Sequence, residues 1–246
     1  MRYIDGFVLA VPDANKQQFI AHAHQADSAF VELGAERVVE CWGTDVPVGK
    51  RTDFQGAVAA EQGETVVFSW IEWPDKATRD KVMAGMGELS KTDARIDPAR
   101  NPMPFDGRRM VFGGFEPLVE RGAAPGDGYV QGFVIPVLSA RRDDYRRLAE
   151  DAWPVFQDHG ALRLVEAWGD DVPDGIQTDF RRAVQAEPGE TVVFSFMQWP
   201  SRAVCDAAQP RMVSDARMKP PAGMEMPFDG QRMIHAGFTP VVWLER

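Results

Sequence analysis

Cysteine is nearly absent from this sequence of 246 residues, which contains only Cys41 and Cys205. We therefore expect no structural disulfide and none of the disulfide framework that small secreted proteins rely on. Apolar runs long enough to span a membrane are missing as well, and residues 1–6 lack the apolar core of a signal peptide. These absences predict a cytoplasmic protein that makes no contact with a membrane.

Positive charge is also in short supply. The chain has 27 Lys and Arg against 37 Asp and Glu, so its net charge is −10. Such a surface repels phosphate backbones, and nucleic-acid binding would require a local basic patch. The best basic run mixes arginines with acids at helical spacing, which is typical of a solvated helix face, so we expect no nucleic-acid partner. This run comprises Arg141, Arg142, Arg146 and Arg147 among Asp143, Asp144, Glu150 and Asp151.

The short motifs of the common enzyme classes are missing. The sequence has no glycine-rich dinucleotide or phosphate loop, no His-Glu-x-x-His, no Gly-x-Ser-x-Gly and no paired Cys-x-x-Cys. This argues against a nucleotide enzyme, a zinc hydrolase and an α/β-hydrolase. Histidine is scarce, and we expect no metal and no tightly held cofactor. The histidines are His22, His24, His159 and His235.

The sequence does contain a repeat, together with 44% hydrophobic residues to build a core. Tyr3-Ile4-Asp5-Gly6-Phe7-Val8 matches Tyr129-Val130-Gln131-Gly132-Phe133-Val134, and the match runs without a gap to Trp73-Pro74 and Trp199-Pro200. Roughly half of these positions are identical. The second copy then loses three residues before Met226 pairs with Met103. No histidine or cysteine recurs, which disfavours a duplicated metal or haem site.

The repeat predicts two modules, residues 1–120 and 129–246. The segment 121–128 is rich in glycine and contains a proline, so it is expected to be an exposed linker.

Within the first copy, apolar periodicity predicts strands over residues 3–11, 37–45, 65–73 and 109–119. A helix is expected after Pro12, and a shorter one after Pro74, over residues 77–86. The resulting order is β-α-β-β-α-β, a ferredoxin-like module. The face of the first helix that packs on the sheet is expected to carry Phe19, Ala23, Ala26 and Phe30.

The third strand of each copy is apolar on both faces. Val66, Phe68 and Trp70 alternate with Val67, Ser69, Ile71 and Trp73. A sheet covered by helices on one side only should present a polar second face, so the other module is expected to cover it. We predict an α+β fold in which two ferredoxin-like modules pair with each other as an intramolecular dimeric α/β barrel. The chain should therefore be a monomer.

Several stretches that recur in the second copy carry a family resemblance. They are Tyr3-Ile4-Asp5-Gly6-Phe7, Glu40-Cys41-Trp42-Gly43-Thr44-Asp45-Val46-Pro47, Thr52-Asp53-Phe54, Glu64-Thr65-Val66-Val67-Phe68-Ser69-Trp70, Met103-Pro104-Phe105-Asp106-Gly107 and Arg109-Met110-Val111-Phe112-Gly113-Gly114-Phe115. The chain resembles domain-of-unknown-function family 1428, an uncharacterised bacterial family grouped with the dimeric α/β-barrel proteins. The resemblance implies this fold. It also implies that single-module members pair as homodimers, whereas this chain fuses two modules. It implies no established activity and no catalytic residue.

A carboxylate recurs within an apolar strand. Glu40 and Trp42 lie two residues apart and share a face, and Glu166 and Trp168 repeat them. An ionised group is costly to bury without a partner, and such a carboxyl often has a raised pKa and serves as an acid or base. Glu40 and Glu166 are therefore the candidate catalytic residues. The alternative is an internal ion pair with Arg37 or Arg109 in the first copy, and with Arg163 or Arg232 in the second.

Other repeated polar residues complete the candidate site. Ser69 and Ser195 lie in the middle of strands and would bind a ligand or merely pack. Thr52 or Asp53 is expected to cap a short helix that carries Phe54, as Thr178 or Asp179 would in the second copy. The candidate ligand-binding residues are Trp42, Trp168, Ser69, Ser195, Arg109 and Arg232.

Three functional hypotheses follow. The chain is a small-molecule enzyme without a cofactor, or a binding or sensing module without turnover. Either would use an apolar, aromatic-lined cavity with few polar groups, and the expected ligand is small and apolar or aromatic. The third hypothesis is a structural or interaction protein whose repeated residues only maintain the fold. Barrels of the superfamily include monooxygenases, isomerases and haem enzymes, which is an analogy of fold alone.

Overall fold

The predicted element order is present in both halves of the chain. The computed structural model describes residues 1–123, 126, 128–219, 223 and 225–246. The first half consists of β1 (Tyr3–Pro12), α1 (Lys16–Glu32), β2 (Arg37–Asp45), α2 (Phe54–Ala57), β3 (Glu64–Trp73), α3 (Lys76–Thr92) and β4 (Val111–Gly122). The second half consists of β5 (Tyr129–Leu138), α4 (Arg142–Asp158), β6 (Arg163–Asp171), α5 (Phe180–Ala183), β7 (Glu190–Trp199), α6 (Arg202–Ser214) and β8 (Ile234–Glu245).

Two elements of the first half differ in extent from the prediction. Helix α3 extends to Thr92. Strand β4 starts later, at Val111, because Asp106 caps a 3-10 turn over Gly107–Arg109. It also continues to Gly122, where it pairs with Arg163 of β6. The module boundaries themselves remain a prediction, since residues 124, 125 and 127 of the expected linker lie outside the described residues.

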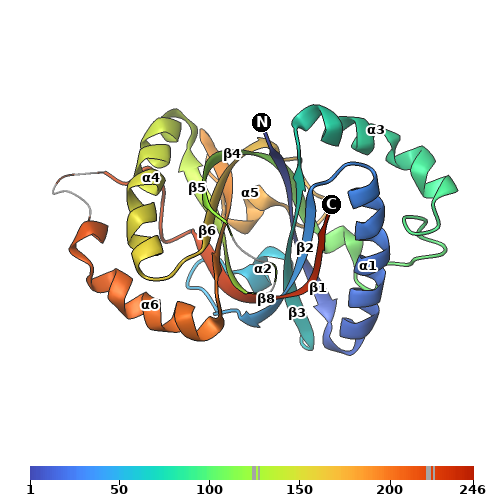
Figure 1. Cartoon of the computed structure of the whole chain (residues 1–246), viewed down its shortest axis with the longest axis horizontal. Helices are drawn as coiled ribbons and strands as arrows, with labels where there is room; N and C mark the ends of the chain where they lie inside the picture. The colour runs from blue at the N-terminus through green and yellow to red at the C-terminus, as the bar shows by residue number, and fades with distance from the viewer. Residues whose placement is uncertain (124–125, 127, 220–222, 224) are drawn as a thin grey trace.

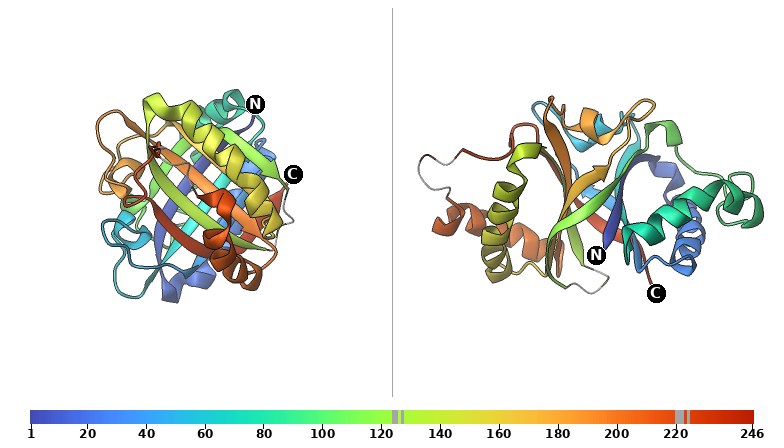
Figure 2. Two further views of the ribbon diagram at one scale, coloured as in Figure 1. Left: turned by 90° about the vertical axis from the view of Figure 1, so that its left-hand side faces the viewer. Right: turned by 90° about the horizontal axis from the view of Figure 1, so that it is seen from above.

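The strands of the described residues close into one barrel in the order β1-β3-β2-β8-β5-β7-β6-β4, and neighbouring strands are antiparallel. Each half contributes four consecutive strands, and the halves join where β2 pairs with β8 and β4 with β6. Helices α1 and α3 flank one side of the barrel and α4 and α6 the other, as Figures 1 and 2 show. The predicted intramolecular dimeric α/β barrel is confirmed.

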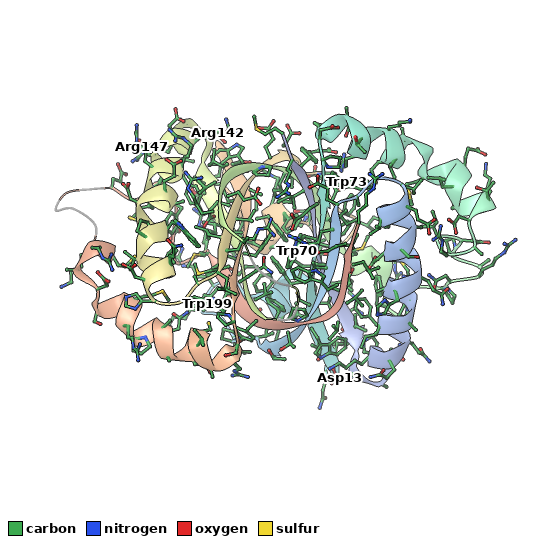
Figure 3. The ribbon with its side chains drawn as sticks, in the orientation of Figure 1. Asp13, Trp70, Trp73, Arg142, Arg147 and Trp199 are labelled. Carbon is green, nitrogen blue, oxygen red and sulfur yellow. The ribbon has the colours of Figure 1, made fainter. Side chains whose placement is uncertain are left out.

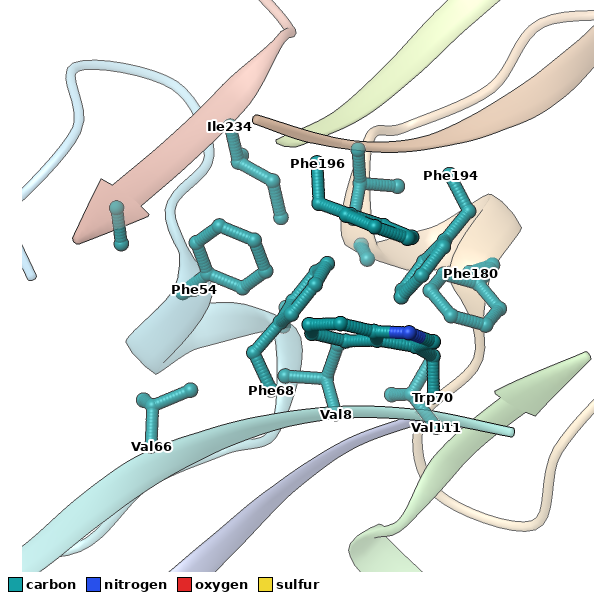
Figure 4. Packing of buried hydrophobic residues seen from close by; sticks show 14 of the residues in the cluster. Val8, Phe54, Val66, Phe68, Trp70, Val111, Phe180, Phe194, Phe196 and Ile234 are labelled. Atoms are coloured by element: carbon teal, nitrogen blue, oxygen red, sulfur yellow. The ribbon is translucent and has the colours of Figure 1, made fainter. Parts of the chain in front are cut away.

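Aromatic side chains from both halves fill the barrel interior. Phe68 of β3 stacks on Phe194 of β7 with ring centroids 4.5 Å apart, and Trp70 stacks on Phe196 at 4.2 Å. Figure 4 shows these rings meeting between the two sheets, and Figure 3 places Trp70 near the centre of the molecule. The second apolar face of the third strand is therefore covered by the other module, as predicted. The interior of the barrel is therefore a packed core to which both halves contribute.

Helices α2 and α5 pack against this core through Phe54 and Phe180. Asp53 accepts a hydrogen bond from the Gly56 amide at 2.6 Å, and Asp179 does the same for Arg182 at 2.7 Å. The aspartates are therefore the predicted helix caps. The threonines beside them have a different role, because the Thr52 and Thr178 hydroxyls donate to backbone carbonyls of the opposite half.

An ion pair also joins the halves. Arg163 of β6 donates two hydrogen bonds to Glu72 of β3, at 2.7 and 2.8 Å, and both residues are buried. Burial raises the pKa of Glu72, but pairing with Arg163 and Arg37 outweighs it and lowers the pKa to about 2. The arginine run of α4 forms local pairs with acids, such as Arg146 with Glu150. Among the described residues, no helix combines the length and apolar character needed to cross a membrane.

Gly6 and its counterpart Gly132 make room for the stacked rings of Phe194 and Phe68 in the barrel interior. A Cβ added at Gly6 would lie 2.8 Å from the ring of Phe194, and one at Gly132 would lie 2.8 Å from Phe68. Each glycine therefore admits a ring from the opposite half, and the two rings hold each other in place.

We expect Gly6→Ala and Gly132→Ala each to lower the free energy of unfolding by about 1–3 kcal/mol, because the overpacked rings have no space to move into. Urea denaturation measures this change. Gly87→Ala is the control, since nothing lies within 4 Å of an added Cβ at that exposed position of α3. It should be neutral or stabilise by up to about 1 kcal/mol. Equal losses in all three variants would contradict the packing argument.

Candidate functional site

The repeated glutamates lie on the outer faces of the two sheets, beneath the helices. Strand β2 directs Val39 and Cys41 into the barrel core, so Glu40 and Trp42 point the other way, toward α1. Trp42 accordingly packs with Phe19 and Ala23 of that helix. The second half repeats this arrangement with Glu166 and Trp168 on β6 beneath α4. Each module therefore has its own layer between helix and sheet.

An equivalent aromatic frame surrounds each glutamate. In the first half the ring of Phe19 lies 6.2 Å from Trp42 and 6.1 Å from Phe105, between centroids. In the second half Tyr145 replaces Phe19 and lies 6.5 Å from Trp168 and 6.0 Å from Phe228. Aromatic side chains thus occupy equivalent positions in the two frames, but only the second frame carries a hydroxyl.

That hydroxyl changes the surroundings of the glutamate. Tyr145 donates a hydrogen bond of 2.7 Å to Glu166, and Ser195 bonds to the same carboxyl. In the first half Glu40 accepts from Ser69 alone among the described side chains. Glu166 is 7% exposed, whereas Glu40 is only half-buried. Tyr145 thus supplies a hydroxyl donor to Glu166 that Glu40 does not have among the described residues.

A second carboxyl lies in the first layer only. Phe19, Ala23 and Asp27 are spaced by four residues along α1 and are all buried. Asp27 is 5% exposed, and its Oδ2 has no hydrogen-bond partner among the described residues. It lies close enough to Glu40 for their charges to interact. The residue at its position in the second half is Trp153, a far larger side chain, which belongs to the apolar cluster beneath α4 and α6.

Burial gives these carboxyls unusual proton affinities. Loss of hydration raises the pKa of Glu40 to about 7 against the lowering effect of the Ser69 hydroxyl. The pKa of Glu166 is also raised to about 7 by burial, against the hydrogen bonds from Tyr145 and Ser195. Burial and the charge of Glu40 raise the pKa of Asp27 well above its usual value. Carboxyls of this kind can give or take a proton near neutral pH.

The ion-pair interpretation of Glu40 and Glu166 is wrong. Arg37 pairs with Glu72 and Glu245, and Arg163 pairs with Glu72 and Glu120. Arg109 and Arg232 form paired hydrogen bonds of 2.7 Å with Glu64 and Glu190. Arg37 and Arg163 each lie three residues before a glutamate on the same strand and so point to the opposite face. Arg109 and Arg232 precede β4 and β8 and pair with acids of β3 and β7.

Among the predicted ligand-binding residues, the structure brings Trp42 and Ser69 together with Glu40, and Trp168 and Ser195 together with Glu166. It does not bring Arg109 or Arg232 to either layer. Sequence reasoning missed Asp27 and Tyr145. Both residues could have been found by aligning the two copies, because Phe19 aligns with Tyr145 and Asp27 aligns with Trp153.

A hollow formed by described residues lies elsewhere, where the two halves meet. It has a volume of about 720 Å³ and lies between residues 47–53 of the first half and 230–235 of the second. It is an open groove and contains neither Glu40 nor Glu166. Within the described residues, no group of three or more His, Cys, Asp and Glu side chains is placed to hold a metal ion. The carboxyls with raised pKa values, Asp27, Glu40 and Glu166, lie in the layers and not in this groove.

Residues 2–107 and 128–230 both match one family model, described as protein of unknown function (DUF1428). The chain belongs to the DUF1428 family. The uncharacterised protein YbaA of Escherichia coli strain K12 is 54% identical over 114 residues, which span 46% of this chain and 97% of YbaA. YbaA of Shigella flexneri matches with the same figures. These bacterial relatives have the length of one module, so this DUF1428 protein is a tandem form.

Solved structures share the fold of this DUF1428 chain along nearly its whole length. A protein of Lactobacillus acidophilus NCFM, described as a candidate monooxygenase, has a TM-score of 0.59 at 11% identity, covering 99% of this chain and 96% of its own. An anthrone oxidase-like protein has a TM-score of 0.56 at 16% identity, covering 99% and 92%. At these identities the likeness concerns the fold alone.

The raised pKa of Glu166 predicts how stability depends on pH. Between the ordinary value of 4.5 and about 7, the unfolded chain releases this proton while the folded protein retains it. The free energy of unfolding should therefore fall as pH rises through this window, with a contribution from Glu166 of about 3 kcal/mol. Glu166→Gln should remove that contribution and be at least as stable as the wild type at pH 8.

Chemical denaturation at a series of pH values measures this difference. The exposed Glu187, changed to Gln, is the control and should leave the pH dependence as it is. If Glu166→Gln instead loses several kcal/mol at every pH, the carboxylate has a charged partner and our assignment fails.

Proposed function

We propose that this DUF1428 protein binds a small apolar or aromatic molecule in the layer between α1 and the outer face of β2, and that Glu40 exchanges a proton with it. The observation that carries the proposal is the difference between the modules. Glu40 accepts a hydrogen bond from Ser69 alone and has no cationic partner among the described residues, whereas Tyr145 also donates to the equivalent Glu166. The first module thus carries the working site.

The second module supports this assignment by acting as an internal comparison. Tyr145 supplies a hydroxyl 2.7 Å from Glu166, where a ligand group would otherwise bind. Trp153 belongs to the packed apolar cluster on that side. The second layer therefore has a hydroxyl and a bulky ring at the positions where the first layer has Phe19 and Asp27.

The proposed chemistry is general acid–base catalysis without a cofactor. A carboxyl with a pKa of about 7 is divided between its two protonation states at neutral pH, which suits proton transfer in either direction. Trp42, Phe19 and Phe105 provide the apolar wall that orients a ring. The alternative, a structural or interaction protein without turnover, requires no free carboxyl at this position.

Exchange of the two modules' residues tests the proposal. Phe19→Tyr should place a hydroxyl against Glu40, as Tyr145 does against Glu166, and so compete with any ligand. We expect Phe19→Tyr and Glu40→Gln to weaken binding of aromatic fragments at least tenfold, which is about 1.4 kcal/mol. Ligand-observed NMR with a panel of phenols, anilines and indoles measures this.

Glu166→Gln is the matched control and should bind as the wild type does. Denaturation curves establish that each variant is folded. A panel without binders, or binders unaffected by Phe19→Tyr and Glu40→Gln, would overturn the proposal and leave the structural alternative. Binders that respond only to changes at residues 47–53 would place the site in the groove between the halves instead.

We further propose that the protein works as a monomer. The edges through which single-module relatives would pair are already joined within the chain, at β2–β8 and β4–β6, and the linker holds the halves at high effective concentration. Light scattering should give the mass of one chain in dilute solution. An obligate dimer would contradict this. The buried free thiols of Cys41 and Cys205 suit a reducing compartment such as the cytoplasm.

A further inference from the structure

Buried acids elsewhere in this protein have partners. Glu72 pairs with Arg163, Asp5 with Arg79 and Glu190 with Arg232, each within hydrogen-bonding distance. This is the ordinary state of buried carboxylates, because an unpaired buried charge is strongly destabilising. Asp27 is the exception. It is as buried as the others, yet its Oδ2 has no partner among the described residues, and the charge that raises its pKa is that of another acid, Glu40.

We infer that the first-module site takes a small primary amine with an apolar body, whose ammonium group lies between the carboxyls of Asp27 and Glu40. This inference rests on the proposed function, since it names the ligand class of the same site. One ammonium group carries three donors. It can satisfy Asp27 Oδ2 and bond to Glu40, whose remaining contact is the Ser69 hydroxyl.

The rest of the site suits an amine better than a metal ion. Two carboxyls are too few ligands for a hard cation, which takes six or more oxygens, and the described residues hold no group of three or more metal-binding side chains. The side chains beside the two acids, Trp42 and Phe19, are apolar and match an organic body better than a hydrated ion. An aromatic face also attracts cations.

The described cations on or against α1 do not supply the missing charge. Lys16 of α1 lies over the ring of Trp42, 4.8 Å from its centroid, and forms no ion pair with either acid. His22, also of α1, bonds to Asn101. Arg95, which contacts α1 at Ser28, is held by Glu32 and Asp93. The second module has Arg142 over Trp168 in place of Lys16, so this surface cation is common to both layers, whereas Asp27 is not.

Binding of an ammonium should displace a proton. Without ligand, two neighbouring buried carboxyls retain a proton between them at neutral pH, consistent with the raised pKa of both groups. With ligand, the ammonium charge stabilises both carboxylates, so the proton leaves to solvent. A neutral ligand of the same shape brings no charge and releases no proton.

Calorimetry with matched pairs of ligands tests the inference. Benzylamine, 2-phenylethylamine and hexylamine are compared with benzyl alcohol, 2-phenylethanol and hexanol, in buffers of different ionisation enthalpy at pH 6.5. We expect at least one amine to bind with one site per chain, at least tenfold more tightly than its alcohol, and with release of a proton. Asp27→Asn should lose at least tenfold in affinity for the amine and keep its affinity for the alcohol.

Glu166→Gln is the control and should bind the amine as the wild type does. Asp27→Asn should also be more stable than the wild type at pH 8, because it removes an unpaired buried carboxyl; if it does not fold, Glu40→Gln provides the second variant. Alcohols that bind as tightly as amines, in a way that depends on Glu40, would overturn the amine inference and leave the proposed function standing. If no ligand of either series binds in a Glu40-dependent way, both fail. Amine binding unchanged in Asp27→Asn would also overturn the inference.

Discussion

The stacking of aromatic rings across the two halves is the interaction on which the rest of this structure depends. Phe68 on Phe194 and Trp70 on Phe196 occupy the space that the two sheets enclose. They close the barrel, and they explain why each copy keeps a glycine where a ring of the other copy passes. They also leave no room for a ligand inside. The repeated glutamates lie instead on the outer faces of the sheets, each beneath the helix of its own module.

Covalent fusion of the modules removes the symmetry that a homodimer imposes. In a homodimer, a substitution that fills one site fills the other as well. Here Phe19 and Tyr145, or Asp27 and Trp153, can differ within one molecule. One layer can thus be packed for stability with a tyrosine and a tryptophan, while the other retains buried carboxyls that destabilise the fold. The second module then contributes half of the barrel whether or not it binds anything.

The sequence predicted the fold well, because its signals are periodic and occur twice. Strand alternation placed Val66, Phe68 and Trp70 on one face, and the lack of a polar face on that strand required a covering partner. The site was predicted less well. Alternation along the strand placed Glu40 and Trp42 on the same face. Because both faces of the sheet are apolar, alternation could not show whether that face lines the barrel interior or lies under the helices. Helical spacing assigned Ala26 and Phe30 to the packed face of α1, and so Asp27 was overlooked.

The expected ion pairs of Glu40 and Glu166 do not form, because the arginines pair with other acids. Counting charges near Glu40 in sequence suggested that a cation would neutralise it. In the structure Arg37 pairs with Glu72 and Glu245, and Arg109 pairs with Glu64, so these cations neutralise acids of β3 and β8 instead. A chain with 27 basic residues pairs many of its acids but brings none of them to Asp27 and Glu40 among the described residues. Proteins tend to retain such destabilising groups where activity needs them. The unpaired acids are therefore better explained by a ligand than by the stability of the fold.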